Sequence, residues 1–391
     1  MTLQTKSLKL TAEATREVVV ERLKTHFNFQ ADGYVCTTDM VVDVLLKAAT
    51  TQQTVEAVCH DLDDMVDGET VRGYLNEQLD KDKCQQLEHQ VNQSLVVGLP
   101  RRLWKSRLEI AIDLHDEPFY GHDPDLSAWA CRGEAKQGTT RFFRVATAYV
   151  IFKEMRLTLA LLFVRPEDQL PEIVAALLRR LRILGVKVRR LYFDKGFCSI
   201  PVLRYVAQSG WAAILACPIR GKKGGTRVLC QGRGSYLTEH TFKSQENGAY
   251  TAPLVVTRTY TTHRRSKRKQ HRVQWLVFVT LNCQLQPHTV RKLYRRRFGI
   301  ETSYRCMRQV RAWTTSRNPA LRFFLISLGF ILVNVWAELR WRFCQVKRQG
   351  RRQIDTKRFE LHRLSAFINR AIEKIYGVVA FIVADVQPLG V

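Results

Sequence analysis

The sequence lacks the features that mark several large protein classes. Its 10 cysteines form no C-x-x-C pair, and none has a histidine nearby at zinc-ligand spacing. We therefore expect no zinc finger, and reduced thiols rather than a disulfide framework. The opening stretch MTLQTKSLKLTAEATREVVV has polar and charged residues throughout its length, so no signal peptide is expected. No internal repeat and no low-complexity tract is visible.

Long uninterrupted apolar runs are also missing. The longest candidate, FFLISLGFILVNVWAEL (323–339), has 17 residues and contains Asn334 and Glu338. A helix that spans a membrane needs about 20 predominantly apolar residues. We therefore predict a buried helix in this stretch and no membrane partner.

Acidic residues are scarce in most of the chain. Residues 1–100 hold 9 Lys/Arg and 16 Asp/Glu, whereas the net charge of the whole chain is +26, so the remaining 291 residues carry +33. An excess of this size on a folded body implies a polyanionic partner, because self-repulsion alone would only destabilise the compact state. Nucleic acid is the first candidate, and an anionic membrane surface is the second.

The chain is long enough for two or three domains, since it has 391 residues of which 46% are hydrophobic. Residues 1–98 are predicted to form an N-terminal helical domain. Within it, residues 50–79 have the apolar spacing of two helices around a glycine-containing break. Their acidic balance leaves dimerisation, the positioning of other elements and DNA reading all open.

From residue 99 the apolar pattern changes to that of an α/β core, whose first part runs to residue 219. Three strands are followed by alternating helices and strands, which predicts a mixed sheet flanked by helices. The first strand is expected at the beginning of 108–121, further strands are expected at 141–152, 156–164, 188–194 and 212–219, and helices are expected at 166–185 and 201–210. Residues 220–287 are predicted to be a β-rich insertion, and residues 288–391 to complete the core and add C-terminal helices.

Two basic segments follow the first part of the core. The insertion contains RTYTTHRRSKRKQHR (258–272), with seven Lys/Arg, which predicts a hairpin tip or an exposed loop. The second, YRRRFGIETSYRCMRQVR (294–311), has six arginines and one acid, Glu301. In a helix, Tyr294, Arg297, Glu301 and Arg308 would share one face. A surface ion pair of Glu301 would contribute only about 0.3–0.5 kcal/mol to stability, so we also consider a functional role for this acid.

Three carboxylates occupy positions that suggest a shared site. Asp113 follows the apolar run LEIAI and is expected to end the first strand, Asp194 ends the strand in LYFDKGF, and Glu301 lies on the late helix. If the first and fourth strands are neighbours, the two aspartates emerge side by side and the helix can bring the glutamate to them. Such acids repel one another but become favourable ligands for divalent metal. Asp116 is a competing first ligand; Asp113 is preferred because it directly follows the strand pattern.

These residues resemble a known family. The segments IAIDLHDEPFYG, LYFDKGF and YRRRFGIETSYRCMR are similar to those of DDE transposases of the insertion-sequence 4 superfamily, which have an RNase H-like core and a β-rich insertion. The last segment matches the signature Tyr, two residues, Arg, three residues, Glu, six residues, Lys, with Arg308 in place of the lysine. Arg offers phosphate a planar fork, whereas Lys offers a point charge. The resemblance covers roughly residues 100–340.

The resemblance implies roles for the matched residues. Asp113, Asp194 and Glu301 would be the catalytic and metal-binding triad for two Mg²⁺ ions, with Mn²⁺ as a substitute, and Tyr294, Arg297 and Arg308 would contact DNA. The expected activity is cleavage of double-stranded DNA at transposon ends and transfer of 3′ hydroxyls into target DNA. A homodimer in a prokaryotic, nucleoid-associated cytoplasmic setting is expected. A non-catalytic DNA-binding regulator and a nuclease without strand transfer stay open as alternatives.

Overall fold

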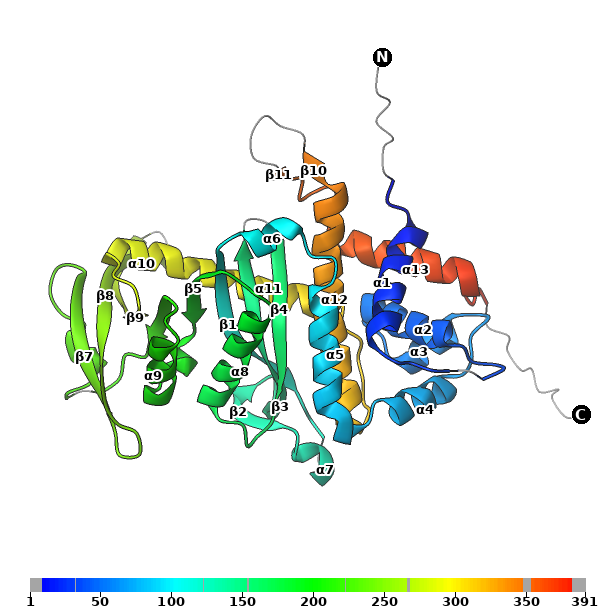
Figure 1. Cartoon of the computed structure of the whole chain (residues 1–391), viewed down its shortest axis with the longest axis horizontal. Helices are drawn as coiled ribbons and strands as arrows, with labels where there is room; N and C mark the ends of the chain where they lie inside the picture. The colour runs from blue at the N-terminus through cyan, green and yellow to red at the C-terminus, as the bar shows by residue number, and fades with distance from the viewer. Residues whose placement is uncertain are drawn as a thin grey trace, which may run out of the picture. The chain divides into compact units, whose positions relative to one another are not determined.

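The computed structural model describes residues 9–31, 33–121, 123–152, 155–221, 223–265, 268–346 and 353–381. The chain forms two compact units (Figure 1). The described residues of Met1–Gly98 and Arg305–Val391 make up the helical unit, and those of Leu99–Tyr304 make up the sheet unit.

The C-terminal helices pack with the N-terminal helices. Residues 288–391 were expected to complete the core and add C-terminal helices, and the helices beyond Tyr304 cluster with the N-terminal helices. The reason is packing: α13 contacts α1 and α2, and α12 contacts α5. The elements of the helical unit are α1 (Ala12–His26), α2 (Thr38–Thr51), α3 (Val55–Asp61), α4 (Gly68–Gln78), the 3₁₀ turn η1 (Lys81–Lys83), α5 (Cys84–Val96), α12 (Pro319–Phe343), β10 (Gln345–Val346), β11 (Gln353–Ile354) and α13 (Leu361–Tyr376).

Helix α12 forms the core of the helical unit and contains the apolar run 323–339. It is long and apolar enough to cross a membrane by length and composition, yet 94% of its most apolar window is buried inside the protein. The prediction of a buried helix is therefore confirmed. Two of its buried polar residues have partners within the unit: the Asn334 amide donates to the Leu95 carbonyl at 2.7 Å, and Glu338 pairs with Arg22 and Arg342.

The sheet unit is built around a nine-stranded mixed sheet of order β2-β3-β1-β5-β6-β9-β8-β7, with β4 also paired to β3. Strand β1 runs parallel to β5, and β5 runs parallel to β6, whereas the other pairs are antiparallel. The strands are β1 (Leu108–Pro118), β2 (Cys131–Lys136), β3 (Thr139–Phe152), β4 (Met155–Val164), β5 (Val188–Phe193), β6 (Ala213–Cys217), β7 (Tyr236–Ser244), β8 (Gly248–Arg265) and β9 (Arg268–Leu281).

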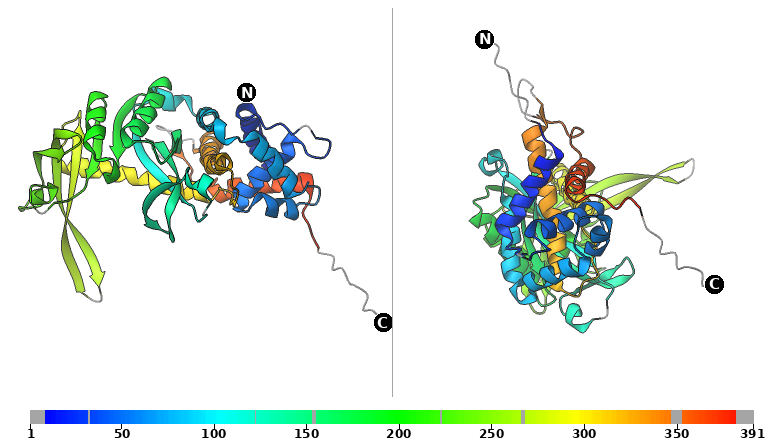
Figure 2. Two further views of the ribbon diagram at one scale, coloured as in Figure 1. Left: turned by 90° about the horizontal axis from the view of Figure 1, so that it is seen from below. Right: turned by 90° about the vertical axis from the view of Figure 1, so that its right-hand side faces the viewer.

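Helices cover both faces of this sheet, with α8 and α9 on one face and α10 with α11 on the other (Figures 1 and 2). The helices and 3₁₀ turns of the unit are α6 (Arg101–Lys105), α7 (Pro124–Ser127), α8 (Leu170–Ile183), η2 (Lys195–Phe197), α9 (Ile200–Gln208), η3 (Thr226–Leu229), α10 (Pro287–Tyr294), η4 (Arg295–Phe298) and α11 (Gly299–Arg308), which continues into the helical unit. The predicted α/β architecture with a mixed sheet and flanking helices is confirmed.

The β-rich insertion extends the core sheet. Strand β9 pairs with β6 from Ala213↔Leu281 to Cys217↔Val277, so the last inserted strand lies directly beside the core. Strands β8 and β9 continue beyond this pairing as a two-stranded ribbon (Figure 2), paired as far as Arg265↔Arg268. Of the two structures predicted for 258–272, a hairpin tip or an exposed loop, the paired strands support the hairpin, and residues 266–267 lie outside the described residues.

Helix α8 and the turn after it lead into β5, the strand that precedes Asp194. Its buried residues recur at helical spacing and cover one face: Ile173, Val174, Leu177, Leu178 and Leu181. Gly185 then adopts a positive φ of 65°, which a glycine tolerates without strain, and its N–H bonds to Arg182. The chain reverses there and enters β5, whose last four residues are buried as expected for a central parallel strand.

Candidate functional site

Asp113 and Asp194 lie side by side because β1 and β5 are parallel neighbours. The final pair in their register is Ile112↔Phe193, and each aspartate is the next residue of its strand or of the turn that follows. The predicted proximity of the two acids is thus confirmed. Asp113 does not end its strand as expected, since β1 continues to Pro118 by pairing with β3, where Asp113 faces Thr147.

The structure separates Asp113 from the competing candidate Asp116. An offset of three residues along a strand places them on opposite faces of the sheet. Asp116 accepts hydrogen bonds from Arg144 Nε at 2.6 Å and from Lys136 Nζ at 3.4 Å. Burial acts to raise the pKa of Asp116, but these two cations lower it below its usual value overall. Asp116 is therefore a paired structural acid.

Glu301 is delivered by a helical segment on the face of β1 that carries Asp113. The predicted single helix over 294–311 is divided into α10, a 3₁₀ turn (η4) and α11, which ends at Arg308. Tyr294 and Gly299 at the two ends of η4 both have right-handed helical dihedral angles, so the helical path continues through it. The turn retains the spacing of four residues between Arg297 and Glu301.

Arg297 lies among the three carboxylates. Its Nη2 donates to Asp113 Oδ2 at 2.8 Å and lies 3.7 Å from Asp194 Oδ1, and its Nη1 lies 4.0 Å from Glu301 Oε1. The side chain of Arg297 is only 6% exposed, whereas those of Asp194 and Glu301 are 39% and 58% exposed. One buried cation thus contacts all three acids, which come from three distant parts of the chain.

The electrostatics of the site reflect this arrangement. Burial, opposed by Arg297 and reinforced by Asp194, raises the pKa of Asp113 to about 6. Burial acts to lower the pKa of Arg297, but Asp113, Tyr294 and Asp194 raise it overall. At neutral pH the site therefore holds a buried carboxylate whose charged form is costly and whose stability depends on a nearby cation.

A second acid on β1, Glu109, anchors the same helical segment. Glu109 lies four residues before Asp113 and so on the same face of the strand. It accepts hydrogen bonds from Arg296 Nη1 at 2.6 Å, Arg190 Nη1 at 3.1 Å and the Tyr192 hydroxyl at 3.1 Å. Adjacent arginines of η4 therefore reach two acids of one strand. Glu109 was not among the predicted site residues, although its spacing of four residues from Asp113 was a usable signal.

The other residues of the signature have different surroundings. Tyr294 is 7% exposed, and its hydroxyl donates to the Phe193 carbonyl at 3.0 Å, which ties α10 to the end of β5. Arg308 is exposed on the last turn of α11. Tyr294 and Arg297 thus face the protein interior, whereas Arg308 faces solvent.

Tyr304 ties α11 to strand β3. It is buried, its hydroxyl lies 2.7 Å from that of Thr147, and its ring lies 4.8 Å from the ring of His115. Burial raises the pKa of Tyr304 well above its usual value, so it stays neutral. Tyr304 lies three residues after Glu301 and could have been placed near the site from this spacing, but no sequence pattern predicted its burial.

The chemistry of the three acids fits a hard divalent cation, because their donors are all carboxylate oxygens. Among the described residues, no group of three or more His, Cys, Asp and Glu side chains is arranged as a ready metal site. Asp113, Asp194 and Glu301 instead meet at the guanidinium of Arg297, a cation of the protein itself.

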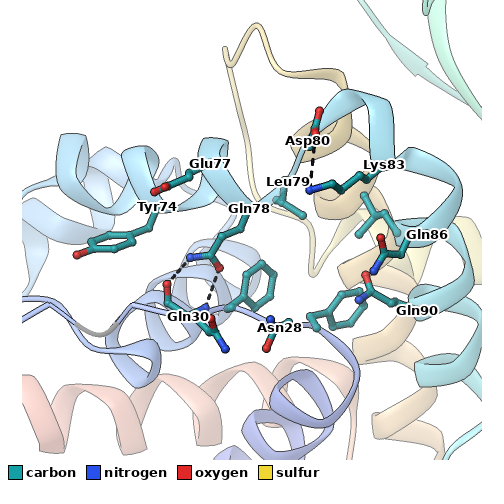
Figure 3. A pocket seen from close by; sticks show the side chains of 13 residues that line it. Asn28, Gln30, Tyr74, Glu77, Gln78, Leu79, Asp80, Lys83, Gln86 and Gln90 are labelled. Carbon is teal, nitrogen blue, oxygen red and sulfur yellow. Dashed lines mark hydrogen bonds and ion pairs between the residues drawn. The ribbon is translucent and has the colours of Figure 1, made fainter.

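A separate polar pocket of about 510 Å³ lies within the helical unit (Figure 3). It contains several amide side chains, and Gln78 bonds reciprocally with the backbone of Gln30. None of Asp113, Asp194 and Glu301 lines it. Its lining has two acids, Glu77 and Asp80, and Asp80 pairs with Lys83 at 3.9 Å.

The family model described as a transposase DDE domain matches residues 124–335, more than half of the chain. The chain belongs to this family of DDE transposases. The match begins after Asp113 and includes Asp194 and Glu301.

Solved structures support the fold of the transposase. It is similar to a chain in the cryo-EM structure of the piggyBac transposase synaptic complex with hairpin DNA, with a TM-score of 0.50 and 11% sequence identity. The similarity covers 94% of this chain and 76% of that chain. No match was found among curated proteins.

Proposed function

We propose that this transposase cleaves double-stranded DNA at transposon ends and transfers the freed 3′ hydroxyls into target DNA, with Mg²⁺ or, as a substitute, Mn²⁺. The observation that carries the proposal is the meeting of Asp113, Asp194 and Glu301 around one cation, all within 4.0 Å of Arg297. A cluster of three acids is unfavourable by itself, because like charges repel one another. The family match and the basic character of the chain support the same activity.

In this proposal Asp113, Asp194 and Glu301 hold the metal, two ions being expected. Bound metal supplies activation of the attacking hydroxyl and stabilisation of the leaving oxygen in phosphodiester displacement. Arg305 and Arg308 are exposed on the same helix as Glu301 and can bind phosphates near the acids. Tyr294 acts at a distance, by fixing α10 to the end of β5.

The wider setting belongs to the same proposal. The piggyBac chain was determined in a synaptic complex with hairpin DNA, and we extend a double-stranded DNA partner to this transposase. The net charge of +26 supports it. Assembly as a homodimer on two DNA ends, and a nucleoid-associated location in a prokaryotic cytoplasm, complete the proposal.

The first prediction tests this activity directly. Purified protein is incubated with Mg²⁺ and a labelled duplex carrying the terminal repeats that flank its coding sequence. Cleaved and joined products are expected with the wild type and should fall by at least about 10²-fold in Asp113→Ala, Asp194→Ala and Glu301→Ala. Asp116→Ala is the matched control, because Asp116 lies on the other face of β1.

The products also separate the alternatives. Cleavage without joining would identify a nuclease of the same fold. Specific binding without cleavage by a correctly folded wild type would identify a regulator. Loss of activity in the Asp116 variant with retention in the Asp113 variant would overturn the assignment of the triad.

A further inference from the structure

Arg297 has a position that phosphate binding alone does not explain. Its guanidinium is buried between the three carboxylates and contacts each of them, yet a residue dedicated to DNA would be expected at the surface. In the free protein it does for the acids what a bound metal ion does, since it brings positive charge to all three oxygens at once.

The Arg297 guanidinium makes few hydrogen bonds. Only the contact with Asp113 is a hydrogen bond, at 2.8 Å, because 3.7 Å to Asp194 and 4.0 Å to Glu301 exceed hydrogen-bond distance. Its Nε is buried and has no hydrogen-bond partner among the described residues. A guanidinium serving only structure would use more of its five donors. Arg297 is therefore positioned by charge and is poorly fixed by hydrogen bonds.

The neighbouring Arg296 is arranged differently. It donates to Glu109 at 2.6 Å, and Glu109 accepts from Arg190 and Tyr192 as well. This cluster anchors η4 to β1 without using any residue of the triad. The segment that carries Glu301 thus has an attachment that does not depend on Arg297.

We propose that Arg297 is a resident counter-ion of the triad: it neutralises Asp113, Asp194 and Glu301 in the metal-free protein and competes with divalent metal for their oxygens, while the Arg296–Glu109 pair holds the helix when Arg297 leaves. This inference rests on the proposed function, because it takes the triad to be the metal site. Metal entry and the departure of the guanidinium are then one exchange of cations.

The exchange gives DNA a part in metal binding. A displaced Arg297 guanidinium can form charge-assisted hydrogen bonds with a phosphate, for which its planar fork is suited. A bound duplex that draws Arg297 away from the acids therefore raises their affinity for metal, and by linkage metal raises affinity for the duplex. The free protein is kept from binding metal tightly before it meets DNA.

The experiment measures binding of Mn²⁺ alone to the full chain, by electron paramagnetic resonance of the free ion, with and without a duplex. Arg297→Gln should bind Mn²⁺ at least about tenfold more tightly than the wild type, because a unit charge a few Å from a divalent ion repels it strongly even at an effective dielectric constant of about 20. Arg297→Lys keeps the charge and should stay near the wild type. Arg296→Gln, the matched control, should not tighten binding.

Two further readouts keep the proposal testable if Arg297→Gln folds poorly. Its melting temperature without metal should fall, and Mn²⁺ should raise it by more than it raises that of the wild type. A duplex should tighten Mn²⁺ binding in the wild type and have a smaller effect in Arg297→Gln.

The outcomes distinguish this inference from the proposed function. Equal or weaker Mn²⁺ binding by Arg297→Gln, with binding still abolished by Asp113→Asn, would overturn the counter-ion role and leave the metal site intact. Mn²⁺ binding that Asp113→Asn does not change would show that the metal lies elsewhere, and the proposed function would fail with it.

Discussion

At the scale of single residues, Asp113 and Asp116 lie three positions apart on one strand, yet their surroundings shift their pKa values in opposite directions. Asp113 faces the helix that carries Arg297, and burial raises its pKa to about 6. Asp116 faces the other way, and Arg144 with Lys136 holds its pKa below the usual value. The two acids therefore contribute to stability with opposite signs at neutral pH.

This difference predicts opposite effects of the same substitution. A raised carboxyl pKa means that stability is lost as pH rises from about 4 to about 6, so in the metal-free protein Asp113→Asn should raise the free energy of unfolding above about pH 6. The gain should be on the order of 1–3 kcal/mol and should fade toward pH 4. Asp116→Asn should lower stability at neutral pH, because a lowered pKa contributes stability above about pH 4 that is lost on acidification.

Urea denaturation across this pH range, in the presence of a chelator, measures both effects. Destabilisation by Asp113→Asn at neutral pH would show that its ion pair with Arg297 outweighs the cost of burying the charge.

At the scale of elements, the sequence predicted most strands of the core and the proximity of Asp113 and Asp194. Both predictions rest on apolar alternation and on the rule that parallel strands end at one edge. Strand β2 was missed because CRGEAK is mostly exposed and polar, with a register shift that alternation does not capture. The burial of Arg297 was missed as well, since a charge pattern does not show which arginine of a run turns inward.

The packing partners of helix α12 could not be predicted from the sequence either. The apolar sequence of a helix predicts that the helix is buried, but it does not predict which elements cover it. The structure shows that Glu338 of α12 bonds with Arg22 of α1 and with Arg342, at 2.6 Å for the latter. Both Arg22 and Glu338 are buried, so each depends on the other for compensation of its charge.

This pair predicts strong coupling between α1 and α12. Arg22→Met should lower the free energy of unfolding by about 3–5 kcal/mol, because it leaves Glu338 buried with less compensation. The double variant Arg22→Met with Glu338→Leu should recover much of this loss, since apolar residues of similar volume often replace a buried pair without cost. A double-mutant cycle by chemical denaturation measures the coupling, and strictly additive losses would contradict it.

At the scale of the whole molecule, charge is divided along the chain. Residues 1–100 are net acidic, and the rest of the chain carries the positive excess that gives a total of +26. Lysine and arginine contacts with DNA release condensed counterions, so affinity must fall steeply as salt rises. The acidic segment holds only 9 Lys/Arg and is expected to contribute less to this dependence on salt.

We therefore predict a strong dependence of DNA binding on salt. If six to ten phosphates are contacted, affinity should fall by about 10³–10⁵ between 50 and 200 mM salt. Fluorescence anisotropy with a labelled duplex measures this slope. A nearly flat response would mean that the basic residues of the chain serve a different partner.

The discontinuous helical unit has a consequence for how the protein is made. Arg22 and Glu338 are separated by 316 residues, and the sheet unit lies between the two segments in the chain. At about 5–20 residues per second, a ribosome needs on the order of tens of seconds to pass from one to the other. During that interval the N-terminal helices are outside the ribosome without the helix that fills their core. We therefore expect chaperones to bind the N-terminal helices during this interval. A chain whose synthesis stops before α12 lacks the helix against which the N-terminal helices pack.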